Sequence, residues 1–246
     1  MNCKNCGKII EGNYCSHCGQ NSKVGKINLS NFLNEVSESV FQINRGLFYT
    51  LRELFVRPGH SVNEFLTGRR KNHFKPVAYV FTFSTLYFLI SRLVGGNTLM
   101  NDVVSGFSIA SNGSESGNEV PSILTWLSEN YAYATLLLVP IFSLASYLSF
   151  SGSGRNYLEH IVLNSYVTGQ QAILYSIFLL LKTFIISKYL ELIPVLISIS
   201  YSFWVFWQFF IKGNRIINIL RSVLTYVLYL IFGFGLLFII NAIHKL

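Results

Sequence analysis

Five long apolar runs constrain the fold of this chain more than any other feature. They cover residues 76–94, 131–150, 160–186, 190–211 and 222–243. An α-helix needs about 20 residues to cross the roughly 30 Å hydrocarbon core of a bilayer, and each run has this length or nearly so. A soluble core of buried helices is the alternative, but five such runs in succession argue against it. The sequence therefore predicts an all-α polytopic membrane protein, with residues 76–246 forming a five-helix transmembrane bundle.

The charged residues favour the same class and suggest an orientation. Only 12% of the 246 residues are charged, whereas soluble domains average about 25%. Eleven Lys and Arg residues precede the first run, and fifteen of the 19 fall on that side of the predicted bundle. Loops rich in Lys and Arg stay in the cytoplasm. We therefore expect a cytoplasmic N-terminus, with the loop 95–130 on the outer side.

The four cysteines form two CxxC pairs, within "CKNCG" and "YCSHCGQ". This spacing is typical of a Cys₄ zinc site, because each pair turns two thiolates toward one ion. Another tetrahedral metal such as iron, or a redox pair, is the alternative; a reducing cytosol disfavours a structural disulfide. We therefore predict a small zinc ribbon over residues 1–21 that binds one structural Zn²⁺ through Cys3, Cys6, Cys15 and Cys18.

In residues 22–75 the apolar residues recur at helical spacing, but no apolar run there is long enough to cross a membrane. Apolar residues predict amphipathic helices over 29–43 and 47–55, the second ended by Pro58 and Gly59. A third helix is predicted from Ser61, with Glu64 completing a capping box and Gly68 ending it. A basic cluster then precedes the first span: Arg69, Arg70, Lys71 and Lys75.

Two interpretations of this juxtamembrane region compete. The helices either form a cytoplasmic collar under the bundle, with the basic cluster fixing topology, or lie in the headgroup layer and bind anionic lipid. Nucleic acid is a less favoured partner, because the positive charge gathers beside the membrane and not along the ribbon.

The third run carries polar residues on one helical face. They recur at three- and four-residue steps: Tyr157, His160, Asn164, Thr168, Gln171 and Tyr175. Ser198, Tyr201, Ser202 and Gln208 of the next run could face them. Such a face either forms interhelical hydrogen bonds or lines a hydrophilic path, and the first interpretation is preferred.

The two CxxC pairs, together with "RGLFYTLRELFVRPGHSVNEFLTGRRKNHFKPVAY", resemble the bacterial domain-of-unknown-function family 3667. The resemblance covers roughly residues 3–79 and implies a membrane-helix bundle in the bacterial inner membrane, but no reaction. The chain contains no Walker A, HExxH or GxSxG pattern. We therefore expect a non-enzymatic scaffold or adaptor whose ribbon docks an unknown cytosolic protein. A small-solute transporter or channel that uses the polar face is the alternative.

Overall fold

The computed structural model describes residues 1–22, 24–25, 27, 46–112, 122–184, 189–211 and 214–244. Over these ranges the fold is all-α, with nine helices and two isolated β-bridges. The helices are α2 (Gly46–Val56), α3 (Pro58–Thr67), α4 (Pro76–Val94), α5 (Leu99–Asn112), α6 (Ser122–Glu129), α7 (Tyr131–Ser149), α8 (Tyr157–Phe184), α9 (Tyr189–Phe209) and α10 (Arg215–His244). The helix predicted over 29–43 lies outside the described residues.

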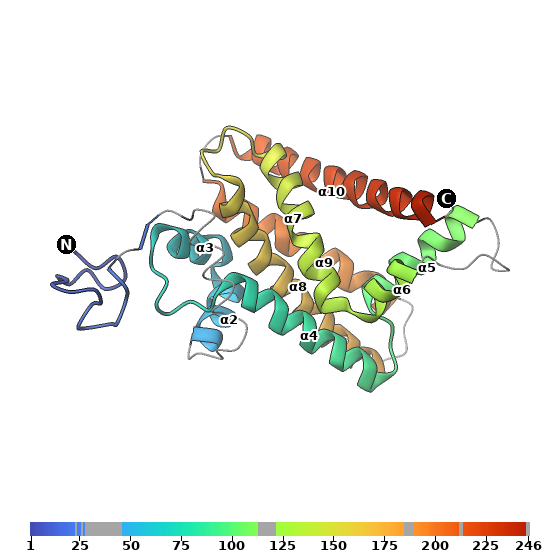
Figure 1. Cartoon of the computed structure of the whole chain (residues 1–246), viewed down its shortest axis with the longest axis horizontal. Helices are drawn as coiled ribbons and strands as arrows, with labels where there is room; N and C mark the ends of the chain where they lie inside the picture. Colours follow the sequence, from blue (N-terminus) through green and yellow to red (C-terminus); the bar gives the residue numbers. More distant parts are fainter. Residues whose placement is uncertain are drawn as a thin grey trace.

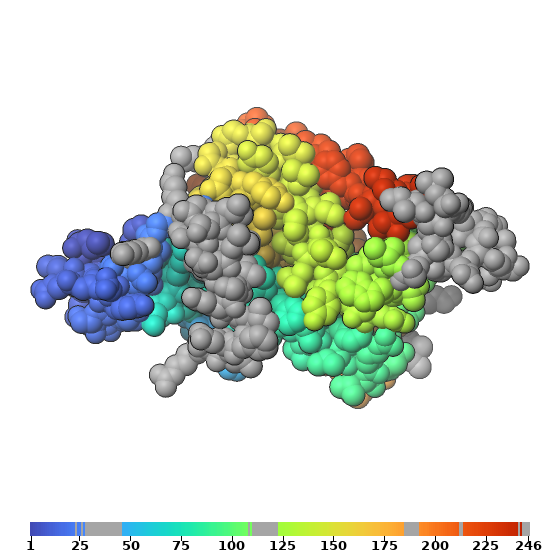
Figure 2. All heavy atoms as spheres, in the orientation of Figure 1, coloured from blue at the N-terminus to red at the C-terminus, as the bar shows by residue number. Residues whose placement is uncertain are grey.

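Five helices, α4 and α7 to α10, form a bundle whose members are inclined by different amounts to the long axis of the molecule (Figure 1). Helix α8 lies among α4, α7 and α9, whereas α10 packs along α7 and α9. The ribbon and the N-terminus lie at one end of this axis, which we call the ribbon end, and the C-terminus lies near α5 and α6 at the other. Figure 2 shows the ribbon, in blue, projecting from the ribbon end.

Four described helices are long and apolar enough to cross a membrane: Pro76–Val94, Tyr131–Ser149, Leu192–Phe209 and Arg215–Ile240. Helix α8 has the length, with 28 residues, but not the apolar composition, because buried polar side chains interrupt it. These include His160, Asn164 and Gln170. Since its neighbours surround it, α8 can carry polar residues that a lipid-facing helix could not. Helices α4, α7 and α9 thus match their predicted runs to within a few residues. Helix α10 begins at Arg215, seven residues before the predicted start at 222, and a fifth span at α8 is not confirmed.

The predicted start of α3 at Ser61 is wrong. The helix begins at Pro58, after an N-cap residue, Arg57, whose side chain makes no capping hydrogen bond. Proline suits the first helical position because it has no N–H to leave unpaired. Ser61 is instead buried inside the helix, with its Oγ 3.1 Å from Nε2 of His73. Gly68 ends the helix at φ 112°, a left-handed conformation that glycine adopts without strain.

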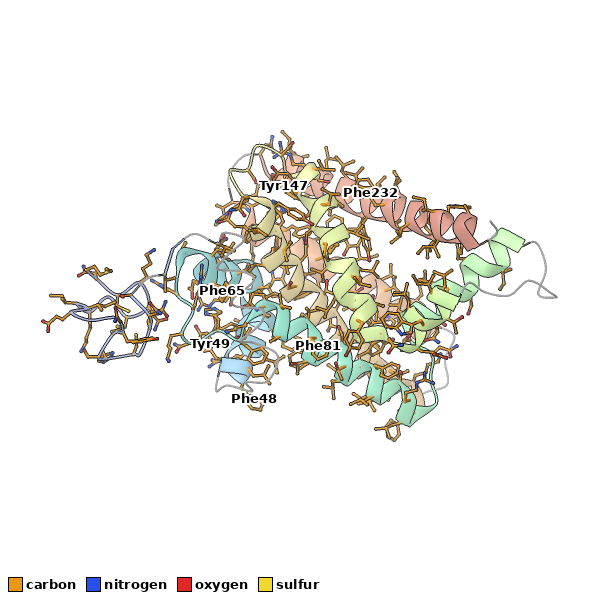
Figure 3. All side chains as sticks on the ribbon, viewed as in Figure 1. Phe48, Tyr49, Phe65, Phe81, Tyr147 and Phe232 are labelled. Carbon is orange, nitrogen blue, oxygen red and sulfur yellow. The ribbon has the colours of Figure 1, made fainter. Side chains whose placement is uncertain are left out.

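Helices α2 and α3 form a collar that shares one apolar core with the bundle. Leu54, Phe65 and Leu66 belong to the same buried cluster as Tyr166 and Phe206. Side chains that do not face this core lie on the surface: Phe48 of α2 is exposed and projects from the collar (Figure 3). The collar is therefore packed into the ribbon end of the bundle.

Candidate functional site

The ribbon consists of two successive turns of matching geometry. The amide of Gly7 donates to the Cys3 carbonyl at 2.8 Å, and the amide of Gly19 donates to the Cys15 carbonyl at 2.7 Å. Both glycines have positive φ, 76° and 70°, which other residues adopt only with strain. Each turn therefore brings its two cysteines to one side.

The four cysteine sulfurs converge on one point. All lie within 4.8 Å of one another, and the Cys3–Cys18 and Cys6–Cys15 sulfur pairs are each 3.6 Å apart. Tetrahedral coordination with metal–sulfur bonds of about 2.3 Å would separate the sulfurs by about 3.8 Å. The arrangement could therefore hold a metal ion, and the donor set of four sulfurs suits zinc or iron.

Backbone amides favour thiolates at this site. Hydrogen bonding from the backbone of Cys18 and His17 lowers the pKa of Cys15 to about 6, and the backbone of Cys6 lowers the pKa of Cys3. The backbone of Lys8 also favours the Cys6 thiolate, but desolvation and the neighbouring thiols outweigh it and raise the pKa of Cys6 to about 12. A bound cation would offset the cost of placing several thiolates side by side, because cysteine binds metals as the thiolate.

The ribbon contacts the collar at the end of α3. The Gln20 side chain, only 4% exposed, donates from Nε2 to the Gly68 carbonyl at 2.8 Å. The Lys4 ammonium donates to the Val24 carbonyl at 2.6 Å, and its stem packs beside Gly68. The ribbon is therefore anchored to the end of α3.

The basic cluster is divided between this contact and the surface. Arg70 donates to the carbonyls of Gly25 and Phe65, at 3.0 and 3.3 Å. Arg69 and Lys71 are exposed, although Lys71 lies beside Gly19 of the ribbon. Lys75 is half-buried and immediately precedes α4. Arg69 and Lys71 are therefore the two exposed cations of this cluster.

The polar residues predicted on α8 form two separate groups. Near the ribbon end, Oγ of Ser146 on α7 lies 2.9 Å from His160 Nδ1, and it accepts from Asn164 Nδ2 at 2.8 Å. Deeper in the bundle, Gln171 Nε2 donates to Ser202 Oγ of α9 at 2.9 Å. Thr168 is half-buried between the two groups.

Gln170 is among the polar residues of the interior that were not predicted. Gln170 is fully buried, and its Oε1 accepts a hydrogen bond from the Tyr79 hydroxyl of α4. It falls outside the three- and four-residue stripe because successive helical residues point about 100° apart. The apolar surroundings of Tyr79 in the first run gave no sign of this partner.

Residues 44–88 match the family model described as "Protein of unknown function (DUF3667)". This match covers 45 of the 246 residues of the chain. The match confirms the resemblance over α2, α3 and most of α4, and it leaves out both the ribbon and the later helices. No curated protein and no solved structure matches the chain.

The DUF3667 segment connects the ribbon to the bundle. Gly68, which accepts the hydrogen bond from the ribbon, ends the same helix that meets α9. At α9, the Gly59 amide donates to Gln208 Oε1 at 3.1 Å, and Asn63 Nδ2 donates to the Phe209 carbonyl at 3.2 Å. A ten-residue helix thus contacts both parts.

Proposed function

We propose that this protein is a non-enzymatic membrane scaffold or adaptor of the bacterial inner membrane, with its ribbon in the cytoplasm. The observation that carries the proposal is the continuous chain of contacts from the ribbon through α3 to α9. Gln20 to Gly68 is its first link, and Gly59 to Gln208 is its second. Such a chain holds a small module at a defined place on a membrane domain, as an adaptor requires.

Zinc is the metal that we propose for Cys3, Cys6, Cys15 and Cys18. Four thiolates fill a tetrahedral zinc site, so no position remains for a catalytic water, and the ion is structural. A segment of some 20 residues has too little core to fold alone, and a bound metal supplies the missing stability. Metal analysis of the purified full-length chain tests this, with one zinc per chain expected and iron or a disulfide contradicting it.

The exposed apolar side chains of the ribbon support a cytosolic protein partner. Ile9 is 69% exposed and Tyr14 is 64% exposed, although the module around them is small. Such residues are common anchors at protein interfaces. Arg69 and Lys71 could add contacts to anionic lipid, each of about 1 kcal/mol. Nucleic acid is not part of the proposal.

A pull-down from membranes tests the adaptor function. The full-length chain is compared with a chain that lacks residues 1–21 and with the double variant Ile9→Ser, Tyr14→Ser. Lys8→Ser, an exposed substitution in the same module, is the matched control. A protein recovered with the full-length chain and the control, but lost from the other two, supports the proposal. Equal recovery with all four would contradict it.

A transporter or channel is the second candidate, favoured by buried polar atoms without a partner. In the part of the chain that the structure describes, three of the buried polar atoms without a hydrogen-bond partner are His160 Nε2, Asn164 Oδ1 and Gln170 Nε2. Buried polar groups are nearly always paired, so such atoms call for water or a solute beside them. All three belong to α8, the central helix.

Gln171→Leu separates the two candidates. If Gln171 only joins helices, its loss should reduce stability by about 1 kcal/mol and leave function intact, because the hydrogen bonds to Ser202 and to the Ser198 carbonyl are interhelical. Thr183→Leu, at an exposed site on the same helix, is the control. Thermal unfolding and the pull-down measure the two effects. A folded Gln171→Leu variant that loses function, together with solute flux in vesicles containing the wild-type protein, would favour the conduit.

A further inference from the structure

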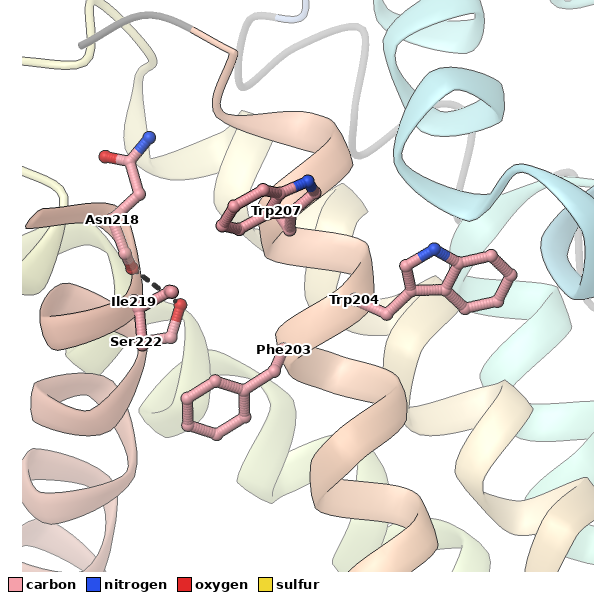
Figure 4. Close-up of a pocket in the computed structure, with 6 residues that line it drawn as sticks. All are labelled: Phe203, Trp204, Trp207, Asn218, Ile219 and Ser222. Atoms are coloured by element: carbon pink, nitrogen blue, oxygen red, sulfur yellow. Dashed lines mark hydrogen bonds between the residues drawn. The ribbon is translucent and has the colours of Figure 1, made fainter. Parts of the chain in front are cut away.

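A half-open groove of about 270 Å³ lies between α9 and α10. Its lining residues are Phe203, Trp204, Trp207, Asn218, Ile219 and Ser222. Phe203 and Trp207 turn toward α10, whereas Trp204 points away from it (Figure 4). The groove lies where α9 ends and α10 begins, which places it at the ribbon end of the bundle.

The walls of this groove offer mainly apolar surface, because the side chains of its two polar residues are hydrogen-bonded within the protein. Its two polar residues, Asn218 and Ser222, are buried and bonded within the protein: Asn218 Nδ2 donates to the Phe210 carbonyl at 2.7 Å, and Ser222 Oγ donates to the Asn218 carbonyl at 2.9 Å. The remaining lining residues are three aromatic side chains and one isoleucine. The groove therefore suits a hydrocarbon chain better than a polar solute.

Positive charge lies at the mouth of the groove. The Arg215 guanidinium stands over the Trp207 ring, 4.8 Å from its centroid, and donates to the Trp207 carbonyl at 2.7 Å. Arg215 is exposed, and the first turn of α10 contains no acidic residue. The sequence contains no Asp or Glu after Glu191, while Arg221 adds a second cation in the second turn of α10. Because a helix N-terminus also attracts anions, the site favours negative charge.

We propose that the groove binds one anionic phospholipid of the cytoplasmic leaflet. Its acyl chain lies against Phe203 and Trp207, and its phosphate is held by Arg215 at the start of α10. This inference rests on the membrane placement in the proposed function. A second copy of the chain fits less well, since a symmetric partner would bring the same cations to the mouth and no acidic residue to balance them.

Brominated lipids test the proposal, because bromine on an acyl chain quenches nearby tryptophan fluorescence. The full-length chain keeps Trp207 as its single tryptophan, through Trp126→Phe and Trp204→Phe, and is reconstituted in phosphatidylcholine vesicles. A small, fixed fraction of brominated phosphatidylglycerol or brominated phosphatidylcholine is then included. We expect the anionic lipid to quench Trp207 more strongly. Arg215→Gln should lower the relative affinity for it about fivefold.

Two controls keep the test specific. A chain with Trp126 alone reports ordinary lipid contact from α6 and should show no preference. Arg92→Gln removes an exposed cation at the opposite end of α4 and should leave the preference of Trp207 intact. Equal quenching by both lipids, or a preference that survives Arg215→Gln, overturns the lipid site while leaving the membrane placement standing. No quenching of Trp207 by either lipid overturns both.

Discussion

At the scale of single residues, His73 shows how burial in the collar favours one protonation state of a titratable side chain. It is buried against the two collar helices, with edge contacts to the rings of Tyr49 and Phe65. Desolvation lowers its pKa, although the Arg69 backbone and the carboxylates of Glu64 and Glu53 oppose the shift, while Arg57 adds to it. The neutral imidazole is therefore the form that the folded collar accommodates.

Stability should fall as the pH drops below about 6.5, the ordinary pKa of histidine. In that range the unfolded chain binds a proton at His73 that the folded chain takes up only at lower pH, so acid favours unfolding. His73→Gln should lessen this dependence, and His60→Gln, at an exposed histidine of α3, is the matched control. Thermal unfolding between pH 5 and 8 measures both, and equal pH profiles for wild type and His73→Gln would contradict the prediction.

At the scale of elements, α3 approaches α9 so closely that only glycine fits at one position. A Cβ on Gly59 would lie 2.5 Å from both the Phe209 nitrogen and Gln208 Cβ. Because one of these atoms belongs to the backbone, the helices must separate to accept any side chain there. Helix α3 also receives the ribbon through Gly68, so its position on α9 governs both contacts.

Gly59→Ala should destabilise the protein by about 1–3 kcal/mol, the usual cost of overpacking. Gly233→Ala on α10 is the matched control, since a Cβ there meets no atom within 4 Å. It should be neutral or stabilise the helix by up to about 1 kcal/mol. Thermal unfolding of the purified variants checks the pair. A Gly59→Ala variant as stable as Gly233→Ala would mean that α3 does not pack on α9 in this way.

Removing the proposed metal should loosen the ribbon and then its contact with α3. Without a cation the four thiols lose what holds them together, and Gln20 loses its fixed place beside Gly68. We expect a chelator or Cys15→Ser to speed hydrogen exchange at residues 3–20 and at the turn 68–71, with α7 and α9 unchanged. Gln20→Ala should affect the turn more than the ribbon. Unchanged exchange after demonstrated metal loss would contradict this.

At the scale of the whole molecule, the alternating helices place the two termini at opposite ends (Figure 1). The turn between α4 and α5 lies at the far end, and the connection between α9 and α10 lies at the ribbon end. Asn97 and Asn214 are exposed residues of these two connections. They can therefore report the two sides of the membrane independently.

Labelling from outside should reach a cysteine at Asn97 but not one at Asn214. The reason is the excess of Lys and Arg at the ribbon end, because segments rich in these residues tend to stay in the cytoplasm. Asn97→Cys and Asn214→Cys are compared in intact cells, in a chain whose four native cysteines are replaced by serine. Permeabilised cells, in which both should react, are the control. If only Asn214→Cys is labelled in intact cells, the protein has the opposite orientation.

The sequence by itself determined the features that depend on near neighbours. The apolar runs set the lengths of α4, α7 and α9, since the cost of placing polar residues in hydrocarbon acts on each helix separately. Glycine after each CxxC pair likewise set the two turns that bring four sulfurs within 4.8 Å. Gly68 ended α3 as expected, because its left-handed conformation depends on its own missing side chain.

Only the tertiary structure decided which distant residues meet. The Ser61–Glu64 pattern is typical of a cap, but Pro58 and the packing of α3 on α9 extended the helix backwards. Gln170 forms a hydrogen bond with Tyr79, which is 91 residues away in the sequence, and Gly59 forms one with Gln208, which is 149 residues away. The periodicity of a sequence indicates whether one face of a helix is polar or apolar. Which other helix packs against that face depends on the packing of the whole bundle. For the same reason α8, whose composition is the least apolar of the bundle helices, takes the central position that its buried polar contacts require.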